Sequence, residues 1–278
     1  MKPAPSLRAQ VAAIARQLHA AGWVANHDGN VTARAEGSAP GGGARGSSRY
    51  LATPTATSKR LIGERDLIEV DAKGAVIGSG KVFGEIGLHL CVYERRPDVG
   101  CVVHAHPPHA TAIASSRSNP IEQPFIAEAM VSLGPKIPRV PYAQPGDAAR
   151  AALAPWCELV DVALLGNHGV LAWGADPEQA FLRLELVEHL AKIAIAAAPL
   201  GGVEPLAAQA IAPLLAARAK ANLGRAADRA VATAAQLGSP QAVVACAPAP
   251  HSPVPTIAPG GSDLASIVRD EVINALRK

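Results

Sequence analysis

Two histidines that stand one residue apart are the sharpest chemical signal in the sequence. His104 and His106 lie at the end of the valine-rich segment 99–106, which two prolines terminate, so this segment is predicted to be a strand. Side chains at positions i and i+2 of a strand project from one face, and the two imidazoles therefore converge on one point. Neutral imidazole is a usual ligand of a metal such as Zn²⁺. Two solvent-facing histidines are the alternative interpretation.

A third ligand is needed, because catalytic zinc sites commonly take three protein ligands and leave one position open. His168 is the candidate. It lies in a Gly-Asn-His-Gly turn directly after the apolar segment 160–165, which is predicted to be a buried strand. If that strand lies near the strand of the histidine pair, His168 comes to the same place. A turn histidine without a ligand role is the alternative.

Glu85 is the candidate for proton transfer. It begins the predicted helix 85–95, which precedes the histidine strand. A carboxylate beside a dication can hold its charge, take a proton from a carbon next to a polarised carbonyl, and return it later. A first-turn glutamate that is stabilised by the helix dipole is the alternative.

Helices and mostly antiparallel strands must position these residues, which indicates an α/β or α+β sandwich. Apolar periodicity predicts helices at 6–21, 85–95, 109–116, 147–156 and 177–198. Alternation, apolar runs and turn residues predict strands at 29–34, 49–53, 67–70, 75–77, 99–106, 137–141, 160–165 and 170–173.

The composition changes beyond Pro199, and we expect four segments: a main domain at 1–199, an Ala-rich helical extension at 200–237, a Pro/Gly-rich linker at 238–261 and an amphipathic helix at 262–278. The last segment has an apolar side and no obvious core of its own to cover.

Composition excludes several classes of protein. Hydrophobic residues make up 49% and charged residues 18% of the 278, which excludes a highly charged disordered chain. The net charge of +3 is too small to suggest nucleic acid or membrane as a partner. The chain has no long apolar run or signal-like segment, and its four cysteines have no paired spacing. We therefore expect a cytoplasmic protein with buried, reduced thiols.

An ordered series of motifs resembles the class II aldolase/adducin family over about residues 7–199. The motifs are Gly29-Asn30-Val31-Thr32-Ala33-Arg34, Thr53-Pro54-Thr55, Glu85 followed by His89, Arg96-Pro97-Asp98-Val99-Gly100, His104-Ala105-His106-Pro107-Pro108-His109-Ala110-Thr111, Val140-Pro141-Tyr142 and Asn167-His168-Gly169-Val170. The resemblance implies an α/β fold with a central, mostly antiparallel β-sheet flanked by helices in three layers.

The resemblance also implies a function and its residues. Zinc would be held by His104, His106 and His168, with Glu85 as the catalytic acid/base and a fourth ligand in the absence of substrate. The implied reaction is reversible cleavage of a ketose, such as a ketose 1-phosphate of the fuculose or rhamnulose type, to a dihydroxyacetone (phosphate) unit and an aldehyde such as lactaldehyde. A sugar-phosphate epimerase, dehydratase or decarboxylase of the same fold and a non-catalytic, adducin-like scaffold are the alternatives.

The positions that bind substrate phosphate in such enzymes are only partly matched. Gly29, Asn30 and Thr55 fit, whereas Ala56 replaces a glycine, and Phe83 and Gly84 replace two serines. The lost donors place phosphate recognition in doubt, unless Lys59 or Lys81 contributes. Phe125 falls near the position of a tyrosine proton donor that some family members supply from a neighbouring subunit, and phenylalanine cannot donate.

Two kinds of protein partner are implied. Family members form rings, so a homo-oligomer is expected, most simply a tetramer. The segment 262–278 on its Pro/Gly-rich linker resembles the encapsulation peptides of bacterial microcompartment cargo enzymes, which implies docking on shell or cargo proteins. Folding back on its own oligomer is the alternative for this segment.

Overall fold

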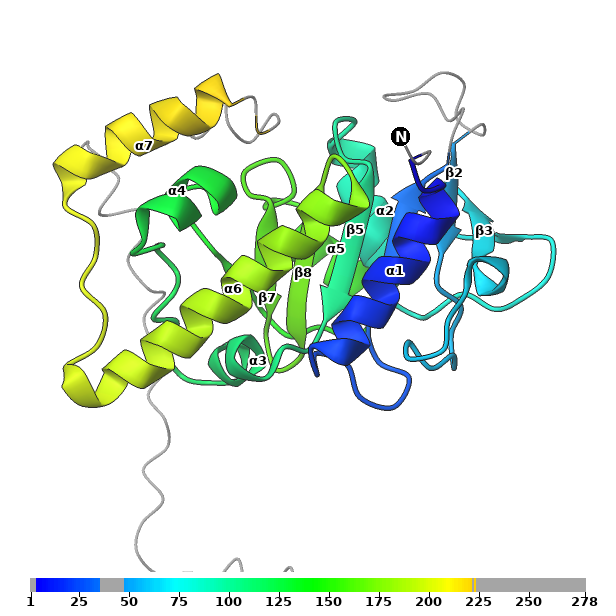
Figure 1. Cartoon of the computed structure of the whole chain (residues 1–278), viewed down its shortest axis with the longest axis horizontal. Coiled ribbons are helices and arrows are strands. Elements are labelled where there is room, and N and C mark those ends of the chain that lie inside the picture. Colours follow the sequence, from blue (N-terminus) through cyan, green and yellow to red (C-terminus); the bar gives the residue numbers. More distant parts are fainter. Residues whose placement is uncertain (1–3, 36–47, 222, 224–278) are drawn as a thin grey trace, which may run out of the picture. The chain divides into compact units, whose positions relative to one another are not determined.

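One eight-stranded sheet forms the middle of the protein, in a computed structural model that describes residues 4–35, 48–221 and 223 (Figure 1). Its order is β4-β3-β2-β1-β5-β8-β7-β6. Neighbouring strands run antiparallel except β6 and β7, which run parallel. The strands are β1 (Asn30–Arg34), β2 (Arg49–Ala52), β3 (Ile68–Asp71), β4 (Val76–Ile77), β5 (Cys101–Ala105), β6 (Arg139–Val140), β7 (Val162–Leu165) and β8 (Gly169–Gly174).

Helices cover both faces of this sheet. They are α1 (Leu7–Ala20), α2 (Ile86–Arg95), α3 (Pro108–Ala114), α4 (Ala127–Leu133), α5 (Asp147–Leu153), α6 (Pro177–Ala197) and α7 (Ala208–Lys220), with 3₁₀ turns at Glu64–Asp66 and Ala198–Leu200. One core packs α1, α3 and α6 on the side of Val103, and a second core packs α2 and α5 on the side of Val102. The predicted three-layer fold with a mostly antiparallel sheet is confirmed.

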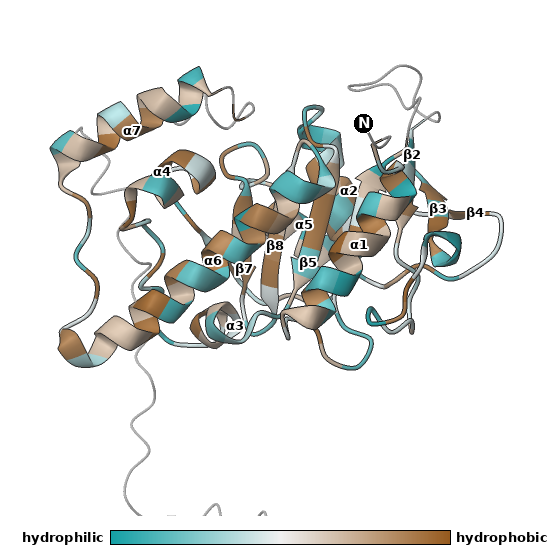
Figure 2. Cartoon of the chain, in the orientation of Figure 1, coloured by the Kyte–Doolittle hydropathy of each residue, from teal (hydrophilic) through white to brown (hydrophobic). Residues whose placement is uncertain are grey.

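Local sequence explains most element boundaries. The Ser6 hydroxyl accepts a hydrogen bond from the Ala9 N–H at 3.0 Å and begins α1, while Asp176 accepts from the Gln179 N–H at 2.8 Å and begins α6. Strands β5, β7 and β8 are buried along their whole lengths and coloured mainly hydrophobic in Figure 2. A fully buried central strand needs apolar residues on both faces, which explains its continuous apolar run.

Two regions differ from the sequence prediction. Helix α4 was not expected, since it is only seven residues long and too short for a clear periodic pattern. The Ala-rich extension was expected to be helical from residue 200, but its α-helix, α7, begins only at Ala208, and α7 contains Pro213. The predicted linker 238–261 and amphipathic helix 262–278 lie outside the described residues.

The cysteines that the structure describes lie in the core. Cys91, Cys101 and Cys157 are buried free thiols. Over the described part of the chain, no helix has both the length and the hydrophobicity that crossing a membrane requires.

Candidate metal centre

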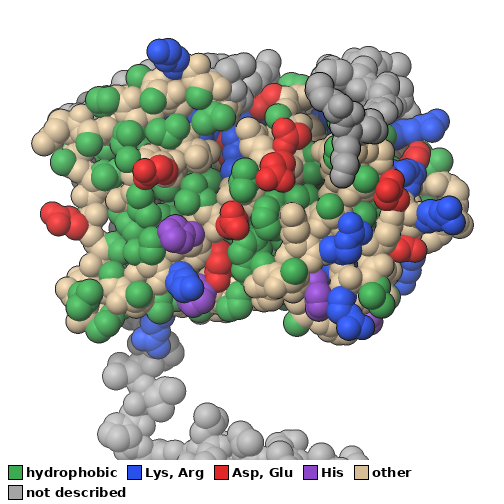
Figure 3. Space-filling view, in the orientation of Figure 1, with side chains coloured by type: hydrophobic (Ala, Val, Ile, Leu, Met, Phe, Trp, Pro, Cys, Tyr) green, Lys and Arg blue, Asp and Glu red, His purple; other side chains and the backbone are tan. Residues whose placement is uncertain are grey.

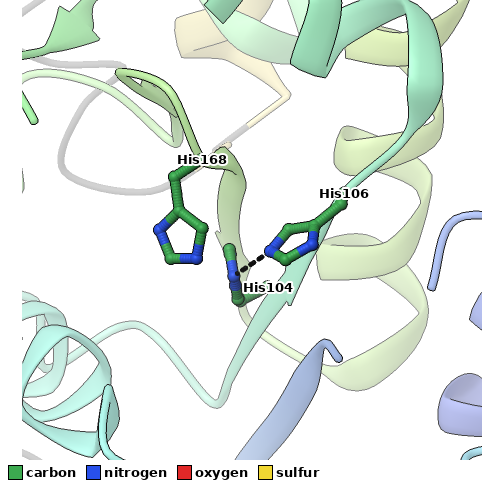
Figure 4. Close-up of side chains that lie close together, drawn as sticks. All are labelled: His104, His106 and His168. Atoms are coloured by element: carbon green, nitrogen blue, oxygen red, sulfur yellow. Dashed lines mark hydrogen bonds between the residues drawn. The ribbon is translucent and has the colours of Figure 1, made fainter. Parts of the chain in front are cut away.

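The order of three central strands brings the predicted histidines together. Strand β5 lies between β1 and β8, with His104 opposite Asn30 on one side and Leu171 on the other. His168 lies in the turn between β7 and β8, so it comes to the end of β5. Figure 4 shows the rings of His104, His106 and His168 facing one another across a small space. The structure thus brings His168 together with a histidine pair from a distant part of the sequence.

The backbone of this turn explains its sequence. Asn167 has a φ of +52°, a left-handed conformation that asparagine tolerates better than most residues. Gly169 follows where β8 passes very close to β5: an added Cβ would lie 2.5 Å from the Ala105 carbonyl oxygen and 2.6 Å from the His106 ring. A side chain at position 169 would therefore displace either the strand or the histidine.

The three rings are arranged as a set of nitrogen ligands would be. The Nε2 atoms of His104 and His106 are 3.1 Å apart, and the ring centroid of His168 lies 4.6 Å from that of His104 and 4.9 Å from that of His106. One nitrogen from each ring lies within 4.8 Å of the others. A metal ion about 2.0–2.1 Å from each nitrogen would fit such a set.

Glu85 points into the same space. Its Oε1 lies 2.9 Å from His168 Nε2 and 3.8 Å from His104 Nε2, and its Oε2 accepts a hydrogen bond of 2.8 Å from Asn30 Nδ2. Glu85 precedes α2 but its side chain makes no capping hydrogen bond. The carboxylate is therefore directed at the histidines rather than at the start of its own helix.

The electrostatics favour neutral imidazoles at His104 and His106 and a charged carboxylate at Glu85. Burial lowers the pKa of His104 to about 3, and burial followed by the nearby His168 lowers the pKa of His106. For Glu85, burial by itself raises the pKa. The hydrogen bond with His168 and the charges of the histidines outweigh it and hold the pKa well below the usual range. Three nitrogen donors and one carboxylate oxygen suit Zn²⁺ and similar divalent ions.

The predicted substrate positions lie on three loops around this cluster. The Asn30 side chain is only 3% exposed and holds Glu85. The Thr55 N–H donates to the Lys81 carbonyl at 3.0 Å, which joins the loop of Thr55 and Ala56 to the segment that leads to Glu85. Gly84 has no atom within 4 Å of the place where a Cβ would be, so the space beside Glu85 is open.

The side chain of Phe83, one of the expected substrate-binding positions, is buried. It is 7% exposed and packs in the core of α2 and α5, with its ring centroid 5.1 Å from that of His89. Burial of an aromatic ring is more favourable than its exposure beside polar ligands. Phe125 likewise packs against the core on the α1 side.

Three further polar residues lie near the cluster, and of these the sequence did not single out Asp28. His89 is fully buried, and its Nδ1 lies 2.9 Å from the Thr32 hydroxyl. Lys59 is 2% exposed, and its Nζ donates to the carbonyls of His27 and Thr57. Asp28 Oδ2 lies 3.5 Å from His106 Nδ1. The one sequence signal for Asp28 as a residue near the metal centre is its position directly before Gly29-Asn30.

A cavity lies apart from these residues. It has a volume of about 510 Å³ and is lined mainly by α6, with Leu182, Leu186 and His189 among its residues. None of the predicted site residues lines it. Figure 3 shows hydrophobic side chains gathered over this helix.

Three relatives carry out related but different reactions. L-fuculose phosphate aldolase of Methanocaldococcus jannaschii is 31% identical over 182 residues, covering 66% of this chain and 92% of that enzyme. Methylthioribulose-1-phosphate dehydratase of Acidiphilium cryptum is 30% identical, with coverages of 65% and 86%. A 3-oxo-tetronate 4-phosphate decarboxylase of Escherichia coli is also 30% identical, with coverages of 68% and 85%.

The fold of this chain is also similar to that of a solved protein. A solved structure of L-fuculose 1-phosphate aldolase superposes with a TM-score of 0.65 at 21% identity, over 79% of this chain and 98% of that one. Residues 9–195 match the family described as the class II aldolase and adducin N-terminal domain. That match spans the sheet, both helical layers and all four residues of the histidine–glutamate cluster, and the chain therefore belongs to this family.

Proposed function

We propose that this protein is a zinc-dependent aldolase that reversibly cleaves a ketose 1-phosphate of the fuculose or rhamnulose type to dihydroxyacetone phosphate and an aldehyde such as lactaldehyde. The observation that carries the proposal is the convergence of His104, His106 and His168 with the Glu85 carboxylate. A family member that kept only the fold, as a scaffold does, has no need of this group of buried and partly buried polar side chains.

The side chains have separate tasks in this proposal. His104, His106 and His168 would hold the zinc ion. When bound, zinc supplies a Lewis acid that polarises the ketose carbonyl and stabilises the negative charge that develops as the carbon–carbon bond breaks. Glu85 moves the proton at the carbon next to that carbonyl: it removes the proton in the condensation direction and returns it in the cleavage direction. Asn30 holds the carboxylate through its 2.8 Å hydrogen bond.

Replacement of Glu85 tests the proposal. Glu85→Gln keeps the size of the side chain but removes the base, so kcat should fall by about 10²–10⁴-fold while the protein still binds zinc. Glu94→Gln is the matched control, since Glu94 lies on the same helix in an exposed ion pair with Arg150. The assay is cleavage of fuculose and rhamnulose 1-phosphates, with and without a chelator. Chelator-insensitive turnover, or no cleavage of either sugar, would contradict the proposal.

Dehydration and decarboxylation are the second candidates, because relatives with those activities are as similar to the chain as the aldolase is. Polarisation of a carbonyl next to an acidic carbon serves all three reactions. Methylthioribulose 1-phosphate and a 3-oxo-tetronate 4-phosphate therefore belong in the same assay. A kcat/KM for either that exceeds the value for the ketose phosphates would assign the chain to that reaction instead.

We also propose that the protein assembles through two separate regions. The catalytic domain would form a homotetramer, which light scattering of the purified protein tests. Segment 262–278 would dock on a shell or cargo protein of a bacterial microcompartment, where a reactive aldehyde product is confined. Fusion of residues 238–278 to a fluorescent protein should give co-assembly with shell proteins, and a diffuse signal would contradict this.

A further inference from the structure

Each metal-binding histidine needs a partner for the ring nitrogen that faces away from the metal, because that partner sets the tautomer and the ring orientation. His104 has such a partner: its Nδ1 lies 2.9 Å from the Val170 carbonyl oxygen. A carbonyl can only accept, so Nδ1 carries the proton and Nε2 keeps its lone pair. That lone pair faces the space between the three rings.

For His106, a carboxylate lies near the ring nitrogen that faces away from the other rings. Nε2 of His106 faces His104 Nε2 at 3.1 Å, and the opposite nitrogen of the ring, Nδ1, faces the Asp28 carboxylate at 3.5 Å. A carboxylate is an acceptor at neutral pH and is therefore suited to an Nδ1–H donor. Ionised acceptors also form the stronger hydrogen bonds.

The turn that carries Asp28 is held firmly in place. The Asp28 N–H donates to the Ala25 carbonyl at 2.9 Å. Gly29 follows with a φ of +67° and lies so close to β5 that an added Cβ would be 3.1 Å from the His104 carbonyl oxygen. Asp28 is therefore attached to a backbone that packs directly on the strand of the histidine pair.

A buried cation supports this turn from inside. The Lys59 ammonium donates to the His27 carbonyl at 3.2 Å and to the Thr57 carbonyl at 3.0 Å, so it joins the turn of Asp28 to the next loop. Its charge also interacts favourably with the Asp28 carboxylate. About half of the Asp28 side chain is exposed to solvent.

We propose that Asp28 is a positioning residue of the metal centre, whose carboxylate accepts the Nδ1–H of His106 and so presents Nε2 of that ring to the metal. The proposal rests on the proposed metal-dependent function. It adds a residue that contacts neither the metal nor the substrate and acts through His106. Loss of such a partner costs about 10–100-fold in metal affinity.

Metal affinity measured without any substrate tests the proposal. Apo protein is titrated with Co²⁺ and with Zn²⁺ against a chromophoric chelator. The Kd should rise about 10-fold in Asp28→Asn, which keeps a weaker neutral acceptor, and up to about 100-fold in Asp28→Ala, which keeps none. Asp147→Asn is the matched control, because Asp147 is exposed at the start of α5, and its Kd should equal that of the parent.

A spectroscopic readout separates positioning from a general loss of structure. In zinc-loaded protein labelled with ¹⁵N-histidine, the parent should show a protected Nδ1–H signal from His106, which Asp28→Ala should lose while circular dichroism stays unchanged. Equal Kd values and an unchanged Nδ1–H signal in the Asp28 variants would overturn the role of Asp28 alone. If the parent itself binds neither metal, the proposed metal-dependent function falls as well.

Discussion

At the scale of single residues, Ala56 adopts a backbone conformation that favours glycine. It stands where the resemblance predicts a glycine, and its φ is +54°, a region that costs an L-residue about 1–2 kcal/mol. Its side chain is exposed, so no packing compensates for the strain. Ala56 therefore holds a left-handed backbone conformation that glycine would adopt without strain.

Ala56→Gly should relieve this strain. Because glycine also loses more backbone entropy on folding, we expect the free energy of unfolding to rise by a net of about 0.5 kcal/mol, measured by urea denaturation. Ala151→Gly is the control: it is exposed in α5 and should lower the free energy of unfolding by about 1 kcal/mol. Equal losses in the two variants would contradict the strain at position 56.

At the scale of elements, one buried carboxylate ties three elements to the strand that leads to His168. Asp161 is fully buried directly before β7. It forms ion pairs with Arg96 after α2, with Arg183 on α6 and with Arg218 on α7. Arg218 also donates to the carbonyls of Val131 and Ser132 at the end of α4. The Arg218 side chain thus links α7 to the core, in addition to the packing of Leu215 against Met130 of α4.

Removal of Arg218 should loosen this attachment. Arg218→Met leaves a buried carboxylate with one partner fewer and two carbonyls without their donor, so the free energy of unfolding should fall by about 3 kcal/mol. Arg8→Met removes a partly exposed pair with Glu69 and should cost about 1 kcal/mol or less. Thermal and chemical denaturation compare the two. A smaller loss for Arg218→Met than for Arg8→Met would contradict the attachment.

At the scale of the whole molecule, buried histidines couple folding to pH. His89 has no exposed surface, and burial, together with nearby His104, lowers its pKa to about 3 from about 6.5 in an unfolded chain. The unfolded chain therefore binds this proton more readily than the folded protein. Burial of neutral His89 therefore does not reduce the free energy of unfolding above about pH 6.5, but it lowers this free energy progressively as the pH falls from about 6.5 toward 3.

The pH dependence of unfolding measures this coupling. In apo protein the slope of the free energy of unfolding between about pH 6 and 4 should decrease by about 1.4 kcal/mol per pH unit in His89→Asn. Asparagine is the chosen replacement because its amide can still meet the Thr32 hydroxyl. His19→Asn removes an exposed histidine on α1 and should keep the parent slope. An unchanged slope in His89→Asn would show that His89 does not carry this effect.

The sequence by itself determined the features that depend on near neighbours along the chain. The Ser6 cap and apolar repeat define α1, and the two histidines spaced for one face of a strand lie together as predicted. These signals are strong because helical and strand periodicities differ over a few residues. The short helix α4 lacked such a signal, and its boundaries follow from packing against α6 and α7.

The tertiary structure decided which distant residues meet. Whether His168 would reach the histidine pair depended on β8 pairing with β5, and no local pattern states which strands pair. The burial of the Phe83 ring and the approach of Asp28 to His106 were decided in the same way. Strand order is set by the burial of the whole sheet between two helical layers, a property of the complete chain rather than of any segment.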